Sequence, residues 1–163
     1  MNYKVPRNLL STRNSKTIKG EKLGYSTYIM YLSRHKQNSK GKNLCSHASP
    51  GCAAACLYGS GAARFDGVQH GKKNKTEYYI ADSKAFMFQL YTELKQISRM
   101  HSLVVGDKKI GRTGKVVRYK KFAVRLNGTA DIPFENLRYK DLDNKNIFEL
   151  FPDIQFYDYT KND

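Results

Sequence analysis

The sequence contains no long apolar run, only 3 cysteines among 163 residues, and few acidic side chains. No stretch approaches the roughly 18 consecutive apolar residues that indicate a membrane helix, which excludes a helical membrane span. Residues 1–10 lack the apolar stretch of a secretory signal, so we expect a cytoplasmic protein without a membrane partner. An odd number of cysteines in such a chain makes a disulfide scaffold the poorest explanation of them.

The shortage of acidic residues leaves a large positive charge that is concentrated in the first half of the chain. Lys and Arg number 29 against 14 Asp and Glu, a net charge of +15, and residues 1–76 hold 14 basic and 2 acidic side chains. Clustered cations gain free energy by releasing counterions from phosphates, so we expect a nucleic acid or a nucleotide as partner. The alternative is a basic protein without such a partner. The candidate contacts are Arg13, Lys16, Lys19, Lys72, Lys73 and Lys75.

The apolar content is sufficient for one folded domain. Hydrophobic residues make up 40% of the chain, with 8 Phe and 12 Tyr, and the length suits a single domain. The first residues are polar and basic, which is typical of an arm or an irregular loop. We therefore expect a basic N-terminal arm over 1–24 and a single α/β domain over 25–163, with a cysteine cluster loop over 45–56.

Segments of strand and helix type alternate along this domain. Runs rich in aromatic and β-branched residues predict strands, and apolar residues at helical spacing from Phe86 to Ile97, after an N-cap at Asp82, predict a long helix. The order strand, helix, strand, helix, strand, with long crossovers, favours parallel pairing. Because a complete barrel needs about 200 residues or more, we expect a partial (β/α) barrel or a small open parallel sheet. The predicted strands are 25–32, 122–126 and 154–157, with short helices near Cys52 and over 146–151 and a hairpin or loop over 106–121.

All three cysteines, Cys45, Cys52 and Cys56, fall within twelve residues. On a helix, Cys52 and Cys56 would share one face, and Pro50 with Gly51 would let Cys45 fold back toward it. Three thiolates at one point suit a [4Fe–4S] cluster that keeps one iron open to another ligand. The same sulfurs suit zinc in a Cys₃His site, and three buried thiols without a metal are the remaining interpretation. The candidate fourth zinc ligands are His35, His47 and His70.

Four segments resemble the phage gene product 88 family. They are 14–17 (NSKT), 48–52 (ASPGC) together with Cys56, 124–133 (VRLNGTADIP) and 156–161 (FYDYTK). The cysteine stretch is also similar to a radical-SAM-like loop in phage proteins, although that loop has three and then two residues between cysteines, against six and three here. The resemblance implies a phage or prophage origin and a cluster-binding partial barrel in the cytoplasm of the host cell, without a settled activity.

The same resemblance implies a cofactor site at the carboxyl ends of the strands, where the active groups of parallel α/β sheets gather. There Gly128 would let the backbone approach a ligand, while Asn127, Thr129 and Asp131 would hydrogen-bond an aminoacyl or ribose group. A turn that ends the strand is the alternative interpretation of these residues. The stretch 158–161 (DYTK) follows the third strand and would lie at the same edge.

The leading hypothesis from the sequence is a phage-encoded iron–sulfur protein of radical-SAM-like type that binds or modifies a nucleic acid or nucleotide. Its open iron would bind S-adenosylmethionine and start radical chemistry. One alternative is a nucleic-acid-binding protein in which zinc or a closed cluster is structural. Another is a phage protein that binds a host factor and uses its cysteines only for stability.

Overall fold

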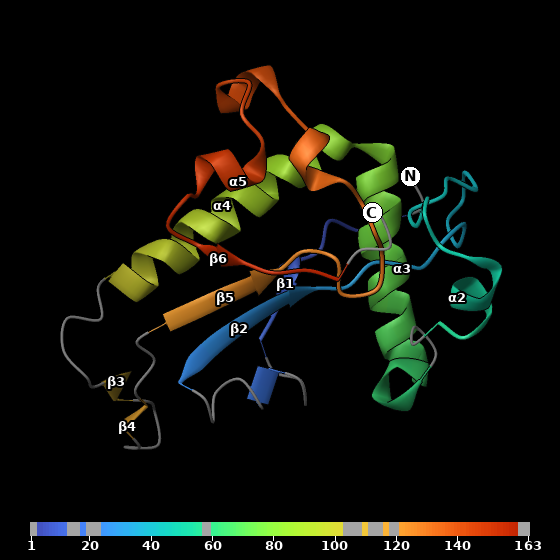
Figure 1. Ribbon diagram of the computed structural model, residues 1–163, viewed down its shortest axis with the longest axis horizontal. Coiled ribbons are helices and arrows are strands. Elements are labelled where there is room, and N and C mark those ends of the chain that lie inside the picture. The colour runs from blue at the N-terminus through green and yellow to red at the C-terminus, as the bar shows by residue number, and fades with distance from the viewer. Residues whose placement is uncertain are drawn as a thin grey trace.

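Four strands form one open, mixed sheet in the computed structural model, which describes residues 3–12, 17–18, 24–56, 60–102, 109–110, 116–117 and 121–159. The strand order is β1-β2-β5-β6 (Figure 1). The strands β2, β5 and β6 are mutually parallel, and β1 pairs antiparallel with β2. This confirms a single α/β domain with a small open sheet. The expectation of an all-parallel sheet is corrected, because the edge strand β1 is antiparallel to β2. The strand bounds are β1 Leu10–Ser11, β2 Tyr25–Met30, β5 Lys121–Arg125 and β6 Gln155–Phe156.

The edge strand β1 belongs to the stretch 1–24 that we predict as a basic arm. Leu9 is fully buried and Leu10 nearly so. The backbone N–H groups of both residues donate to the carboxylate of Glu93, at 2.7 and 3.0 Å. Residues 3–12 are therefore part of the folded domain. Burial of two adjacent leucines stabilises this position by more than the dehydration of the neighbouring charged side chains destabilises it.

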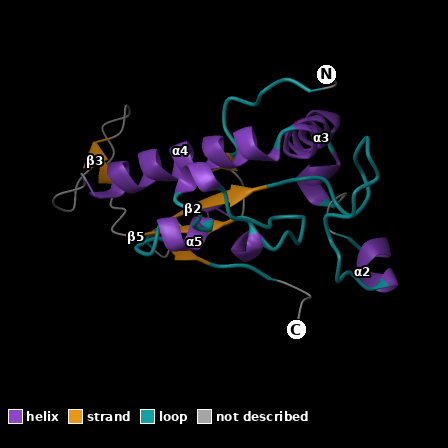
Figure 2. Ribbon diagram, turned by 90° about the horizontal axis from the view of Figure 1, so that it is seen from above, coloured by secondary structure: helices purple, strands orange, loops and turns teal. Residues whose placement is uncertain are grey.

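Four α-helices, α2 Pro50–Ala54, α3 Asp66–Ala81, α4 Ser83–Ser102 and α5 Ile147–Leu150, accompany the sheet. Figure 2 shows α4 running along one face of the sheet. Its predicted apolar positions form the centre of the core, since Phe86, Leu90 and Leu94 are fully buried. The predicted N-cap is confirmed as well, because Oδ1 of Asp82 accepts the N–H of Ala85 at 2.9 Å.

The helix α5 confirms the short helix that we predict over 146–151. Its N-cap Asn146 accepts hydrogen bonds from the N–H groups of Phe148 and Glu149, and the Glu149 carboxylate accepts the N–H of Asn146 in return. This reciprocal capping box fixes the start of the helix. The remaining short strands, β3 Lys109–Ile110 and β4 Val116–Val117, pair antiparallel and confirm a hairpin within 106–121.

The helix α3 is the element that the sequence pattern does not reveal. It carries no apolar stripe because it buries polar side chains, among them Thr76 and Glu77, next to Tyr78 and Tyr79. These polar groups are hydrogen-bonded; the hydroxyl of Thr76 accepts the N–H of Ser33 at 2.7 Å. A helix that buries satisfied polar groups is invisible to a search for apolar periodicity.

No helix in the described part of the chain is long and apolar enough to cross a membrane.

Candidate functional site

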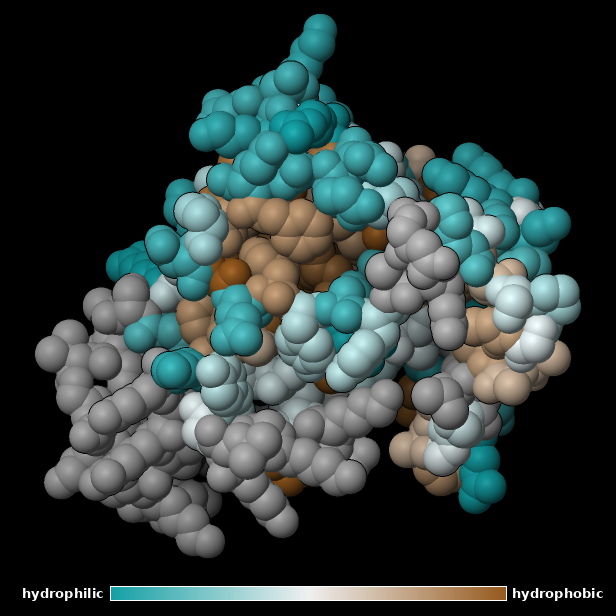
Figure 3. All heavy atoms as spheres, viewed as in Figure 1, coloured by the Kyte–Doolittle hydropathy of each residue, from teal (hydrophilic) through white to brown (hydrophobic). Residues whose placement is uncertain are grey.

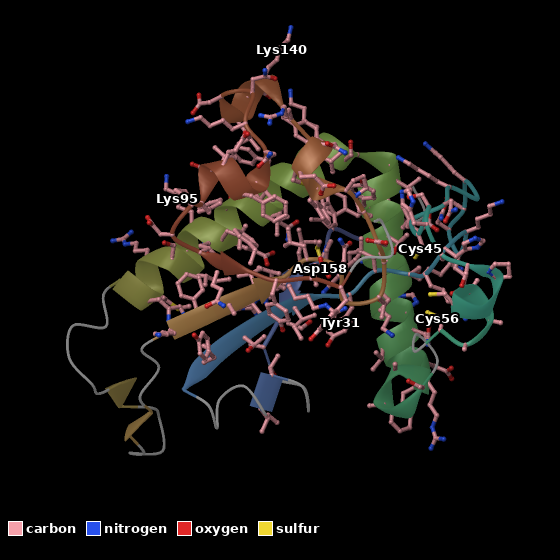
Figure 4. All side chains as sticks on the ribbon, in the orientation of Figure 1. Tyr31, Cys45, Cys56, Lys95, Lys140 and Asp158 are labelled. Atoms are coloured by element: carbon pink, nitrogen blue, oxygen red, sulfur yellow. The ribbon has the colours of Figure 1, made fainter. Side chains whose placement is uncertain are left out.

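The carboxyl ends of the three parallel strands meet at one edge of the sheet, and the loops that follow them lie side by side there. Figure 4 shows Tyr31 and Asp158 at this edge, with Cys45 and Cys56 beyond it on the side of α2. The loop after β2 joins the loop after β5 through a parallel bridge between Cys45 and Asp131. The N–H of Asp131 donates to the carbonyl of Leu44 at 2.8 Å. The cysteine loop and the Asn127 loop are therefore neighbours.

The side-chain amide of Asn127 holds its own loop in shape. Its Oδ1 accepts the N–H of Ile132 at 2.9 Å and its Nδ2 donates to the carbonyl of the same residue at 3.0 Å. The residue is only 7% exposed. Both ends of the amide are used within the loop, as the turn-type interpretation expects. Asn127 also lines a cavity behind this loop, and its contact with a ligand stays a prediction.

Gly128 and Thr129 attach the same loop to the end of β2. The N–H of Gly128 donates to the carbonyl of Met30 at 2.9 Å, and a Cβ on this glycine would lie 2.5 Å from that oxygen. The hydroxyl of Thr129 donates to the carbonyl of Leu32 at 2.5 Å. Gly128 thus lies close against the end of β2, and its approach to a ligand stays a prediction.

Asp131 and Asp158 face a cavity of about 230 Å³ behind this loop. Figure 3 shows apolar surface in a hollow between α5 and the strands, surrounded by hydrophilic side chains. Oδ2 of Asp158 accepts the N–H of Asn127 at 2.9 Å, and its other oxygen lies 3.4 Å from Nε of Arg125. Burial raises the pKa of Asp158, although these partners oppose the shift. The cavity is also lined by Ser46, His47, Glu135 and Phe148.

Of the C-terminal stretch 158–161, the structure describes two residues. Asp158 lies at the sheet edge as predicted from its place after the third strand, and Tyr159 is largely exposed with the Arg125 guanidinium 4.7 Å from its ring centre. Thr160 and Lys161 lie outside the described residues.

Cys45 is the best-fixed of the three cysteines. Its Sγ accepts the backbone N–H of His35 at 3.3 Å, and His35 adopts a left-handed backbone conformation with φ of 45°. Burial raises the pKa of the Cys45 thiol, and backbone hydrogen bonds from His35 and Asp131 lower it in part. Amide donors of this kind also stabilise a thiolate that binds a metal, and they tune the potential of a cluster.

Cys52 and Cys56 occupy a short segment with few attachments to the core. The helix α2 has five residues and none is buried; Ser49 caps it by accepting the N–H of Cys52 at 3.1 Å. The helix ends at Ala54, so Cys56 lies beyond it, and our expectation that both cysteines share one helical face is wrong. The helix propensity of three alanines does not provide enough free energy to extend so short a helix through Cys56. Figure 4 shows Cys45 and Cys56 on the same side of the sheet edge, near α2.

The three sulfurs do not form a ready metal site. Among the described residues, no three His, Cys, Asp or Glu side chains lie close enough to hold one ion. The three candidate histidines are also dispersed: His35 meets Cys45 through its backbone, His47 lines the 230 Å³ cavity, and His70 lies on α3. The donor set has the chemistry of a metal site, but its ligands are not assembled in this conformation.

Two of the three described candidate nucleic-acid contacts are turned into the protein. Lys72 is 5% exposed, and Nζ of Lys75 donates to the carbonyl of Leu9 at 2.6 Å. Burial lowers the pKa of Lys75. Lys73 is exposed at the surface. The candidate contacts Arg13, Lys16 and Lys19 lie outside the described residues.

A second and larger cavity, of about 760 Å³, lies between the loop after β2 and α3. Its lining includes Lys36, His70, Lys73 and Glu77. No local pattern in the sequence predicts α3, so the cavity cannot be expected from the sequence. The excess of basic residues in the first 76 positions is the one feature of the sequence that draws attention to the segments forming this cavity.

Comparison with known proteins identifies one family. The model of the gene product 88 family matches residues 8–162, nearly the whole chain. No curated protein and no solved structure matches the chain. These comparisons give no support to the likeness between the cysteine stretch and a radical-SAM loop. They do support the resemblance carried by the four segments, and the chain belongs to the gene product 88 family of phage proteins.

Proposed function

We propose that this protein binds a [4Fe–4S] cluster through Cys45, Cys52 and Cys56. The observation that carries the proposal is the environment of Cys45, whose sulfur accepts the backbone N–H of His35 at 3.3 Å. Three cysteines, one of which has an amide donor to its sulfur, fit the chemistry of a cluster that has one open iron. The alternative of three inert buried thiols fits less well, because all three are only partly buried.

Assembly of the site requires a movement of the segment that carries Cys52 and Cys56. This segment buries no side chain of α2, so little packing energy opposes the movement. Cys45 stays in place because its neighbours Leu44 and Asp131 are joined by the 2.8 Å backbone hydrogen bond. Metal binding commonly supplies the free energy that orders its own ligands.

A bound cluster of this type supplies an iron at which S-adenosylmethionine can bind and be reduced, which is the source of radical chemistry. The chain's own residues have other tasks. The backbone N–H groups of His35 and Asp131 would stabilise the Cys45 thiolate. Asn127, Gly128 and Thr129 would keep the neighbouring loop rigid through the bonds described above. Asp131 and Asp158 would face a ligand in the 230 Å³ cavity.

The test is metal and sulfide analysis of protein produced and reconstituted without air. We expect about four iron and four sulfide ions per chain in the unchanged protein. Cys45→Ser, Cys52→Ser and Cys56→Ser should each lose most of the iron, while Ser46→Ala, an exposed change in the same loop, should retain it. One zinc per chain without sulfide, or iron content that is insensitive to the cysteine changes, would refute the cluster.

We also propose that the basic half of the molecule recruits a nucleic acid or a nucleotide to this edge of the sheet. The supporting observation is the +12 net charge of residues 1–76, which include both the cysteines and the 760 Å³ cavity between the loop after β2 and α3. Binding of single-stranded, duplex and RNA oligomers across a salt series tests this recruitment. Absence of binding at low salt would refute it.

A further inference from the structure

We propose that the cavity between loop 33–39 and α3 binds the sugar–phosphate backbone of a single-stranded nucleic acid. This inference rests on the proposed recruitment of a nucleic acid, and it does not depend on the metal. In Figures 1 and 2 the loop after β2 lies beside α3. The cavity measures about 760 Å³, within the range of about 300–1,000 Å³ that is usual for ligand sites.

The walls of the cavity are held in place by hydrogen bonds between the loop and the helix. The carboxylate of Glu77 accepts the N–H of Ser39 at 2.7 Å and its hydroxyl at 2.5 Å. The hydroxyl of Thr76 accepts the N–H of Ser33 at 2.7 Å. Since these partners come from segments far apart in sequence, they fix the loop on the helix. A fixed cavity binds its ligand with a small loss of conformational entropy.

The chemistry of the lining selects the kind of ligand. Nine of the ten lining residues carry non-aromatic polar or charged side chains, and His70 supplies the one aromatic ring; they are Ser33, Lys36, Gln37, Asn38, Ser39, Asp66, Gln69, His70, Lys73 and Glu77. Successive nucleobases need several aromatic faces for stacking, and His70 offers one at most. Ribose hydroxyls and phosphate oxygens need hydrogen-bond donors, acceptors and cations, which the cavity does offer.

Lys36 and Lys73 supply the positive charge from opposite walls, the first from the loop and the second from α3. Both residues are exposed, and within the described residues no hydrogen bond or ion pair holds either ammonium group. Of the two acidic residues in the lining, Glu77 is buried and bonded to Ser39. Asp66 remains as an acceptor for a sugar hydroxyl. The two lysines are therefore the groups that would contact phosphates.

The position of the cavity connects it with the cysteine corner. Lys36 follows His35, whose backbone N–H donates to the Cys45 sulfur. A strand held by Lys36 would therefore run next to the proposed cluster site.

The experiment compares two double variants with the same change of charge. Lys36→Gln/Lys73→Gln alters the cavity, and Lys95→Gln/Lys140→Gln alters exposed lysines that Figure 4 shows away from Cys45. Fluorescence anisotropy with a labelled oligouridylate, whose riboses carry free 2′-hydroxyls, gives the affinity and its salt slope across a salt series. We expect the cavity variant to lose about tenfold in affinity at low salt, and its slope to fall by about 1.4 for two lost phosphate contacts. The control variant should change by about twofold or less.

Three outcomes would overturn the proposal. Equal losses in the two double variants would mean that only the overall charge attracts the oligomer. Absence of oligomer binding by the unchanged chain would remove the nucleic acid altogether. Binding of ribose 5-phosphate that depends on Lys36 and Lys73, without binding of the oligomer, would assign the cavity to a small sugar phosphate. Unchanged urea midpoints should confirm folding of both variants, and the iron content measured in parallel separates any failure here from a failure of the cluster.

Discussion

The loop after β5 and the cysteine segment lie side by side at one edge of the sheet, but they are built in opposite ways. The loop 126–132 is attached on every side by hydrogen bonds from Asn127, Gly128 and Thr129. The segment with Cys52 and Cys56 has a five-residue helix without a buried side chain. The first region has the contacts of a scaffold, and the second has few contacts with the core.

This difference separates two kinds of polar residue that look alike in a sequence. Asn, Gly and Thr serve equally well in a rigid turn and in a ligand site. Only the positions of their partners distinguish the two roles. Here the partners are backbone groups of the sheet and of the loop itself, so the loop supports the sheet edge, and the role of the cysteines is the proposal to be tested. The predictions below test this division, from the largest expected effect to the smallest.

Gly128→Ala should destabilise the protein strongly. The new Cβ would lie 2.5 Å from the Met30 carbonyl oxygen and 2.7 Å from a ring carbon of Tyr31, so the backbone has to shift. Overpacking of this kind costs about 3 kcal/mol, which urea unfolding would measure. The matched control is Gly67→Ala in α3, where no heavy atom lies within 4 Å of the new Cβ; it should raise stability slightly. Equal stabilities of the two variants would contradict the scaffold role.

Asn127→Ala should cost about 2 kcal/mol, because it leaves the buried N–H and C=O of Ile132 without their partner. The control is Asn136→Ala at an exposed position, with an expected change of about 0.5 kcal/mol or less. Both values come from urea unfolding. A purely ligand-binding Asn127 would instead leave stability unchanged and weaken only ligand affinity.

Cluster reconstitution should slow amide hydrogen exchange in the cysteine segment about tenfold, which corresponds to about 1.4 kcal/mol. Exchange over 126–132 should change little, because that loop is already held by its own bonds. Mass spectrometry of the two peptides, with and without the cluster, gives the comparison. A similar change in both regions would show that they do not differ in the way we describe.

The smallest effect concerns pH. Burial raises the pKa of Asp158, so the folded chain keeps a proton there at pH values at which the unfolded chain has lost it. The contribution of Asp158 to stability therefore falls as the pH rises from the ordinary pKa through the raised one. Asp158→Asn removes this dependence, so the stability advantage of the unchanged chain over the variant should shrink as the pH rises. The control Asp153→Asn makes the same substitution at an exposed position; the same pH dependence of stability in the two variants would exclude the effect.

Much of the fold can be predicted from local patterns. The strands β2 and β5 are detectable because each is a short apolar run, and such a run can be identified without knowledge of its partners in the sheet. The helix α4 is detectable from Phe86, Leu90 and Leu94, and α5 from its capping residue Asn146. The helix α3 escapes detection because its buried face is polar and is satisfied by loop 33–39, a segment that no local pattern connects with it.

The sequence by itself determined the alternation of strands and helices, the excess of positive charge and the proximity of three cysteines along the chain, since each depends on neighbouring residues or on composition. Tertiary structure alone decided which of the polar residues contact one another. It turned Lys72 and Lys75 inward, directed Gly128 toward β2, and placed Lys36 opposite Lys73. The physical reason is that hydrogen bonds and charge contacts act over a few ångströms in space, and the chain path that creates those distances is set by the packing of the whole core.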